Sequence, residues 1–251
     1  MLYRELNLSD LHIPYCDPFA WRLVLNIVEV VKPTKINVLG DALDFYQLST
    51  FDKDPKQLEN GRLQEDFDQW FRMARELQRA APATCEYTFL PGNHEDRLRR
   101  YLNRNPELYG LRALELPSLM RLDELGFSYF EDEVEIVRGL LVGKHGDVVR
   151  KDSAFSAKGE LEKEKYAIST ITGHTHRLGT HYARTRNRVV KAMENGCLCD
   201  LNPTYMKNPN WQQGCTMVTH FGGEMFHIED LPFLNSGERV KAVVHGQVVT
   251  L

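Results

Sequence analysis

Five short segments of this chain end in side chains of the kinds that bind divalent metal ions, and most of them follow an apolar run that predicts a buried strand. In order along the chain, the segments are Asp10-Leu11-His12, Gly40-Asp41-Ala42-Leu43-Asp44, Gly92-Asn93-His94-Glu95, Gly143-Lys144-His145-Gly146 and Gly173-His174-Thr175-His176. A buried strand delivers the residues at its carboxyl end to one edge of a sheet. The five segments together therefore predict a fold in which several strands end at one shared site.

The spacing of the polar residues suits a pair of metal ions. Asp10 and His12 are two residues apart, so in an extended chain their side chains point the same way and can share one ion. Asp41 follows a glycine that lets the backbone approach closely. Its two carboxylate oxygens can bridge two ions roughly 3.5–4 Å apart, the arrangement expected for hydrolysis of phosphate esters. The alternative interpretation of Asp41 is a helix cap.

A core position is the usual interpretation of a single histidine, and it remains the alternative for each one here. Five of the nine histidines, however, lie beside a glycine or an acid at an expected strand end, which favours metal ligands. These five are His12, His94, His145, His174 and His176.

The expected elements alternate between strands and helices early in the chain and are mostly strands later, which predicts an α/β sandwich of two sheets flanked by helices. We expect helices over residues 18–31, 58–81, 118–125 and 160–166, and an Arg-rich helix from about residue 95. We expect strands over residues 2–8, 36–39, 85–90, 127–130, 134–137, 140–142, 168–172, 189–193, 216–221, 225–228, 240–244 and 247–251. No repeat, linker or boundary divides the sequence, so we expect one domain over residues 1–251.

Composition excludes several classes of protein. The apolar share of 42% is enough for a sizeable core, and no run approaches the roughly 18 apolar residues of a membrane span. The first expected strand leaves no room for a signal peptide, and five irregularly spaced cysteines do not suggest a disulfide framework, so we expect a cytoplasmic protein. Cys197 and Cys199 form a C-x-C pair, which we interpret as two residues on one face of a strand in preference to a thiolate metal site.

Basic residues cluster twice, although the formal net charge of the chain is −4. The first cluster contains Arg97, Arg99, Arg100 and Arg104, and the second contains Arg177, Arg184, Arg186, Arg188 and Lys191. Such clusters are often solvated faces. Because both begin beside candidate metal ligands, we also consider a role in holding phosphates, with Arg97 and Arg177 as the candidate contacts.

These motifs resemble those of the calcineurin-like metallophosphoesterase family, in which D-x-H, G-D-x-x-D, G-N-H-E, a lone histidine after a strand, and G-H-T-H follow in this order. The match spans Asp10 to His176, about two-thirds of the chain. A looser likeness, to phage or prophage members, rests on residues 208–214. The resemblance implies a four-layer α/β/β/α sandwich in which two mixed β-sheets are flanked by helices.

The resemblance also implies the composition of the site. One metal site would contain Asp10, His12, Asp41 and His176, and a second would contain Asp41, Asn93, His145 and His174. A hydroxide held between the metals would attack phosphorus, His94 would stabilise or protonate the leaving oxygen, and Asp44 would orient His94. Nitrogen and oxygen ligands without thiolate fit Mn²⁺, Fe or Zn²⁺, and Ni²⁺ or Co²⁺ are compatible. We favour two Mn²⁺ ions, because family members so often work with Mn²⁺.

Departures from the family pattern bear on the substrate. Phosphoprotein phosphatases of this superfamily carry Arg-Gly after the second aspartate of G-D-x-x-D, whereas Phe45-Tyr46 follow Asp44 here. We therefore expect a phosphodiesterase acting on nucleotides or nucleic acid, with a phosphomonoesterase (a protein or nucleotide phosphatase) as the alternative. A binding module without turnover is a third hypothesis.

The expected partner is a phosphate ester substrate, which could be single-stranded nucleic acid, and no membrane is involved. No protein partner is predicted. Four aromatic residues in expected loops could stack on bases or could serve packing alone. They are Tyr46, Phe51, Tyr205 and Trp211.

Overall fold

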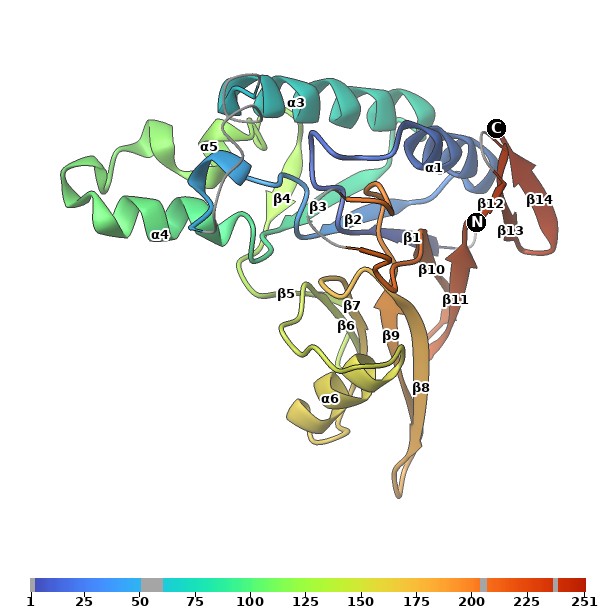
Figure 1. Cartoon of the computed structure of the whole chain (residues 1–251). Coiled ribbons are helices and arrows are strands. Elements are labelled where there is room, and N and C mark those ends of the chain that lie inside the picture. The colour runs from blue at the N-terminus through green and yellow to red at the C-terminus, as the bar shows by residue number, and fades with distance from the viewer. Residues whose placement is uncertain (1–2, 51–60, 204–206, 237–238) are drawn as a thin grey trace.

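The computed structural model describes residues 3–50, 61–203, 207–236 and 239–251 and contains a six-stranded mixed sheet (Figure 1). The strand order is β11-β10-β1-β2-β3-β4. Strands β1 to β4 are parallel, β10 pairs antiparallel with β1, and β11 pairs antiparallel with β10. The bounds are β1 Tyr3–Leu8, β2 Lys35–Leu39, β3 Glu86–Leu90, β4 Phe127–Tyr129, β10 Gly214–Gly222 and β11 Met225–Pro232.

A second mixed sheet has five strands in the order β5-β6-β7-β9-β8. Strands β6, β7 and β9 are parallel, with β5 and β8 antiparallel at the two edges. The bounds are β5 Glu133–Val137, β6 Leu141–Lys144, β7 Ser169–Thr172, β8 Leu178–Arg184 and β9 Val189–Asn195. A small antiparallel sheet of β12 Leu234–Ser236, β13 Arg239–Val244 and β14 Gln247–Thr250 lies beside α1.

Helices cover the outer faces of the two larger sheets, which gives the expected four-layer α/β/β/α sandwich (Figure 1). Helices α1 (Pro18–Val31) and α3 (Leu63–Ala80) lie on the six-stranded sheet, and α6 (Phe155–Lys163) lies on the five-stranded sheet. The remaining helices are α4 (Asp96–Arg104), α5 (Leu116–Leu119) and the 3-10 turns η1 (Tyr46–Leu48), η2 (Pro106–Leu108) and η3 (Arg112–Leu114). None of the helices in the described ranges combines the length and apolar character that crossing a bilayer requires.

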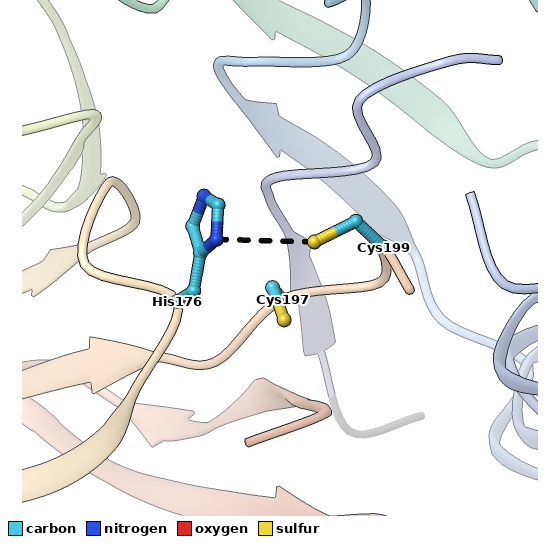
Figure 2. Close-up of side chains that lie close together, drawn as sticks. All are labelled: His176, Cys197 and Cys199. Atoms are coloured by element: carbon cyan, nitrogen blue, oxygen red, sulfur yellow. Dashed lines mark hydrogen bonds between the residues drawn. The ribbon is translucent and has the colours of Figure 1, made fainter. Parts of the chain in front are cut away.

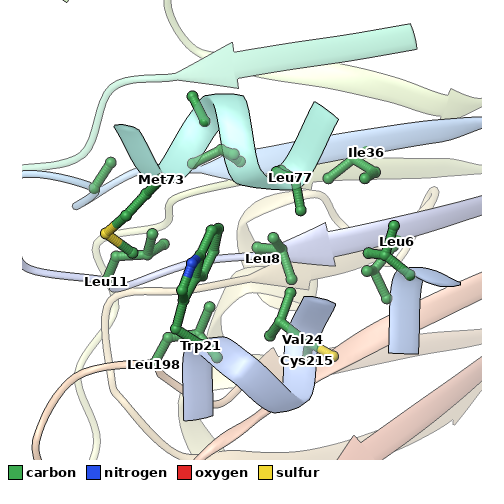
Figure 3. Close-up of a cluster of buried hydrophobic side chains, with 14 of the residues drawn as sticks. Leu6, Leu8, Leu11, Trp21, Val24, Ile36, Met73, Leu77, Leu198 and Cys215 are labelled. Carbon is green, nitrogen blue, oxygen red and sulfur yellow. The ribbon is translucent and has the colours of Figure 1, made fainter. Parts of the chain in front are cut away.

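The main core lies between α1, α3 and the six-stranded sheet (Figure 3). Leu6 and Leu8 alternate along β1 with polar residues, so they face the helices, where Trp21 and Val24 of α1 pack against them. Full burial of side chains of this size stabilises a fold by roughly 1.5–3 kcal/mol each. Helix α1 starts as expected, because the Asp17 carboxylate accepts the N–H groups of the first turn.

The helix expected over residues 118–125 is wrong in its position. The structure has a single turn, α5, over Leu116–Leu119. Pro117 is compatible with the first turn of a helix because its missing N–H would have no partner there. Arg121 then adopts a φ of 56°, which is outside the right-handed helical region and ends the helix.

Other boundaries move by a few residues. The helix expected over 160–166 begins earlier, at Phe155, and ends at Lys163 because residues 165 and 166 both have positive φ. The start expected for the long helix at residue 58 lies outside the described residues, and the described helix begins at Leu63. Strand β8 was not expected, because its half-exposed sequence Leu178–Arg184 has no regular apolar alternation.

Candidate metal centre

The loops that follow β1 and β2 run side by side beyond the six-stranded sheet. The backbone N–H of Asp10 donates to the carbonyl of Gly40 (3.1 Å), and that of His12 donates to the carbonyl of Asp41 (2.9 Å). Strands β3, β6 and β7 end at the same place and carry the remaining candidate ligands. The five motif-bearing segments therefore meet at one site, as parallel strands allow.

One group of donor atoms comes from Asp10, His12 and His176, which are all buried. The Nε2 atom of His176 lies 3.4 Å from Asp10 Oδ1, and the Nε2 atom of His12 lies 3.9 Å from the same oxygen. The two Nε2 atoms are 2.9 Å apart. Two ring nitrogens that face each other and a carboxylate at this distance suit a shared cation.

A second group surrounds Asp41. The Nε2 atom of His145 lies 3.2 Å from Asp41 Oδ2 and 3.1 Å from Asn93 Oδ1, and the Nδ1 atom of His174 lies 2.6 Å from the same Asn93 oxygen. Asp41 Oδ2 also lies 3.7 Å from His12 Nε2, in the first group. The chemistry of both groups, imidazole nitrogens with carboxylate and amide oxygens, fits a first-row divalent ion.

The two carboxylates make the site attractive to positive charge. Asp10 and Asp41 are 0% and 1% exposed. Burial disfavours a protonated imidazole, yet the charge of Asp41 outweighs that effect and raises the pKa of His145 to about 10. Burial also opposes protonation of His176, but a hydrogen bond with Asp10 raises its pKa to about 10. A field that holds protons on two histidines also favours cations.

Backbone strain is concentrated in these loops. Five of the seven candidate ligands have φ between 48° and 72°, a region that residues other than glycine rarely occupy. They are Asp10, His12, Asp41, His174 and His176. Each such residue costs of order 1–3 kcal/mol, and clusters of this kind are typical of functional sites. The loops are thus held in shapes that bring the side chains together at the expense of local stability.

His94 and Asp44 lie beside the two groups. The Nδ1 atom of His94 is 2.8 Å from the carbonyl oxygen of Asp44 and 3.3 Å from its carboxylate Oδ2. Although burial disfavours the charged imidazole, Asp41 and Asp44 raise the pKa of His94. Burial also opposes ionisation of Asp44, but hydrogen bonds with His12 and His94 hold the pKa of that carboxyl well below its usual range. An ionised Asp44 next to a protonatable His94 is the arrangement that an acid catalyst needs.

Arg97, expected to contact substrate phosphate, lies next to this pair. Its guanidinium donates to the carbonyl oxygen of Asp44 (2.8 Å), and a second nitrogen lies 3.1 Å from His94 Nε2. The other proposed contact, Arg177, is placed differently. It is 7% exposed and donates to the backbone carbonyls of Arg150 and Lys151, so its guanidinium is committed to holding that loop.

Glu95 is a residue of the site that the sequence analysis quoted without giving it a role. Its buried carboxylate accepts backbone N–H groups of Asp41 (2.9 Å), Leu43 (2.9 Å) and Gly92 (2.7 Å). It therefore ties the β2 and β3 loops together. The sequence carried no signal for this role, because Glu95 accepts N–H groups of loop residues and does not cap α4.

Cys197 and Cys199 lie after β9 and form isolated bridges, not a regular strand as expected. Both are buried, and Figure 2 shows Cys199 directed at His176. The sulfur of Cys199 lies 3.8 Å from His176 Nδ1, which leaves Nε2 for the first group. A neutral imidazole carries one proton, so His176 can bind a metal ion through Nε2 while its Nδ1–H donates to the sulfur of Cys199.

Comparison with solved structures supports the fold. The chain is similar to Vps29 of Chaetomium thermophilum in complex with a cyclic peptide, with a TM-score of 0.50 and 11% identity over 100% of this chain and 98% of that one. The likeness concerns the fold, and the mixed sheets flanked by helices are consistent with a metallophosphoesterase-like sandwich. Vps29 of Entamoeba histolytica complexed with Zn²⁺ matches with a TM-score of 0.44 and 13% identity over 99% of this chain and 97% of that one. No family model and no curated protein matches the sequence.

Proposed function

We propose that this chain is a two-metal-dependent phosphodiesterase that acts on nucleotides or nucleic acid. The observation that carries the proposal is the convergence of seven nitrogen- and oxygen-donor side chains from five strand ends of a metallophosphoesterase-like sandwich. Asp41 lies in contact with both groups of donors, and we assign it the role of bridge. Mn²⁺ is the ion we expect.

Two bound divalent ions would lower the pKa of a water molecule and offset charge on the phosphoryl oxygens. The protein would supply the rest. The buried Asp10 and Asp41 hold the site negative before it is loaded, and strained loops fix their positions. Asp44 holds His94 through Nδ1, and Nε2 would give a proton to the leaving oxygen after exchanging its contact with Arg97 (3.1 Å) for the substrate.

Phe45 supports a diester over a monoester substrate. A monoester dianion carries more charge than a diester, and its extra oxygens favour a bidentate arginine. Phosphoprotein phosphatases of the superfamily have arginine at this position, whereas Phe45 is fully buried and packs against Phe67. Phe45 thus belongs to the hydrophobic core, and the position that holds arginine in those phosphatases carries no positive charge here.

Arg97 supports the alternative, a phosphomonoesterase. Its guanidinium reaches the Asp44 carbonyl and His94 from α4, so it could replace the missing arginine in holding a third phosphoryl oxygen. The Arg97→Ala substitution separates the two functions. A phosphomonoesterase would lose activity on monoesters steeply, whereas a phosphodiesterase would keep most of its activity on a small diester.

The test is a comparison of rates on a chromogenic diester and the matching monoester, with Mn²⁺ and each other candidate metal. We expect the diester to be cleaved faster at neutral pH. A monoester preference of tenfold or more would overturn the diesterase assignment and favour the phosphatase. No turnover of either ester with any metal would overturn both and favour a binding module.

A further inference from the structure

Strands β8 and β9 form a hairpin that projects from the five-stranded sheet, with its turn well away from the other elements in Figure 1. Its base is at the candidate metal centre, because β8 starts two residues after His176 and β9 ends two residues before Cys197. Six steps of strand separate Leu178 from Arg184, so the turn lies roughly 20 Å from the base.

The hairpin is strongly basic in an acidic protein. Its one acid, Glu194, is fully buried at the base, whereas the rest of the hairpin contains Arg184, Arg186, Arg188 and Lys191. The three arginines are exposed, and none forms an ion pair with any residue in the described ranges. The repulsion between the three positive charges is therefore not reduced by an ion pair with any described acidic side chain.

The first basic cluster is different. Arg97 contacts Asp44, and both Arg99 and Arg100 donate to Asp96 at 2.5 and 2.6 Å. Three of the four arginines in that cluster therefore have an acidic partner. Arg104 is exposed and also has no ion pair in the described ranges, so the hairpin differs from the first cluster in carrying three such arginines close together.

The two faces of the hairpin have different surroundings. Ala183, Val190 and Ala192 pack on α6. The opposite face carries Tyr182, which is 62% exposed, and Val189, its diagonal neighbour, which is also 62% exposed. Lys191 lies directly across from Tyr182, with its ammonium 5.5 Å from the ring centroid. This face therefore combines an exposed aromatic ring with cations.

We propose that the β8–β9 hairpin binds single-stranded nucleic acid and leads it to the metal centre. The arginines would contact successive backbone phosphates, and Tyr182 would stack on a base, the combination typical of single-strand binding. The inference rests on the proposed function for its link to cleavage, but binding is measurable without turnover.

The length of the hairpin predicts how the affinity depends on the length of the oligonucleotide. A strand lying along roughly 20 Å of protein spans about six stacked nucleotides at about 3.4 Å each. Affinity should therefore rise with oligonucleotide length up to about six to eight nucleotides and then level off. Cleavage rates at low substrate concentration should follow the same dependence.

The test uses the full chain with Mn²⁺ and a fluorescent single-stranded 20-mer, whose integrity is checked on a gel after each titration. The variant replaces Arg184, Arg186 and Arg188 together with glutamine. The matched control replaces three exposed arginines of α3 with glutamine, which changes the net charge equally on the far side of the molecule (Figure 1). The control residues are Arg72, Arg75 and Arg79.

We expect the hairpin variant to bind the 20-mer at least tenfold more weakly than wild type at low salt. The slope of log affinity against log salt should become shallower by about 2, because three phosphate contacts each contribute about 0.7. The control should bind within twofold of wild type. Hydrolysis of a small chromogenic diester should be unchanged in both variants.

Three results would overturn the inference. They are equal losses of affinity in the hairpin variant and the control, unchanged affinity in the hairpin variant, and wild-type binding to anionic phospholipid vesicles but not to the 20-mer. Failure of the proposed function is a separate result: no diester turnover by a wild-type protein whose hairpin still binds the 20-mer.

Discussion

Replacement of Glu5 by glutamine should stabilise the protein at neutral and alkaline pH. Glu5 is 2% exposed and lies in β1 on the face opposite the main core. Its carboxylate accepts one hydrogen bond, from Asn37 Nδ2 at 2.9 Å. His220 Nε2 lies 3.0 Å away but makes no hydrogen bond with any described residue. A glutamine amide could keep the bond with Asn37 and donate to that ring nitrogen.

The magnitude follows from the pKa of Glu5, which burial raises from 4.5 to about 7 against the opposing bond from Asn37. Below about pH 4.5 both the folded and unfolded forms are protonated, and nothing is lost. Between pH 4.5 and 7 the unfolded form ionises first, so stability falls as pH rises. The full cost above pH 7 is about 3 kcal/mol, at 1.36 kcal/mol for each unit of pKa difference.

The assay compares urea unfolding of wild type and Glu5→Gln at pH 4 and pH 8 at one metal concentration. We expect similar stability at pH 4 and an advantage of up to about 3 kcal/mol for the variant at pH 8. Glu29→Gln, at an exposed position of α1, is the control and should change stability by less than about 0.5 kcal/mol at both pH values. Equal stability of Glu5→Gln and wild type at pH 8 would refute the reasoning.

Three further substitutions test the assigned roles. Asp41→Asn should weaken binding of both ions and destabilise the metal-loaded protein, which elemental analysis and thermal unfolding measure. His94→Ala should keep its metal content while turnover falls by roughly 10²–10⁴-fold, with smaller losses for good leaving groups. Loss of metal along with activity would instead make His94 a ligand. Cys199→Ala should weaken metal binding by roughly 10–100-fold because it releases Nδ1 of His176, whereas Cys197→Ala should change it little; equal losses would indicate a thiolate site.

The sandwich could be predicted from sequence because its central strands are short apolar runs that end abruptly. Residues 36–39 and 168–172 are flanked by turn residues and lead directly into glycine and a polar group. The order of such runs restricts the chain to few topologies. Helix boundaries were less predictable, because an unfavourable φ such as that of Arg121 depends on tertiary packing and not on residue type.

Contacts within the site were less predictable than the list of its residues. The partners of Arg97 and Arg177 depend on where α4 and the loop near residue 150 lie, and sequence spacing does not encode that. Cys199 contacts His176 because the pairing of β8 with β9 brings the segment before β8 close to the segment after β9. The role of Glu95 was also not predictable, because two of the N–H groups that it accepts belong to Asp41 and Leu43, far earlier in the sequence.

Anomalous diffraction from crystals grown with Mn²⁺ tests the central claim most directly. We predict two peaks roughly 3.5–4 Å apart, both within ligand distance of Asp41. One should also contact Asp10 and His12, and the other should contact His145 and Asn93. A single peak, or a pair of peaks of which only one contacts Asp41, would contradict the two-metal site on which the proposed phosphodiesterase activity depends.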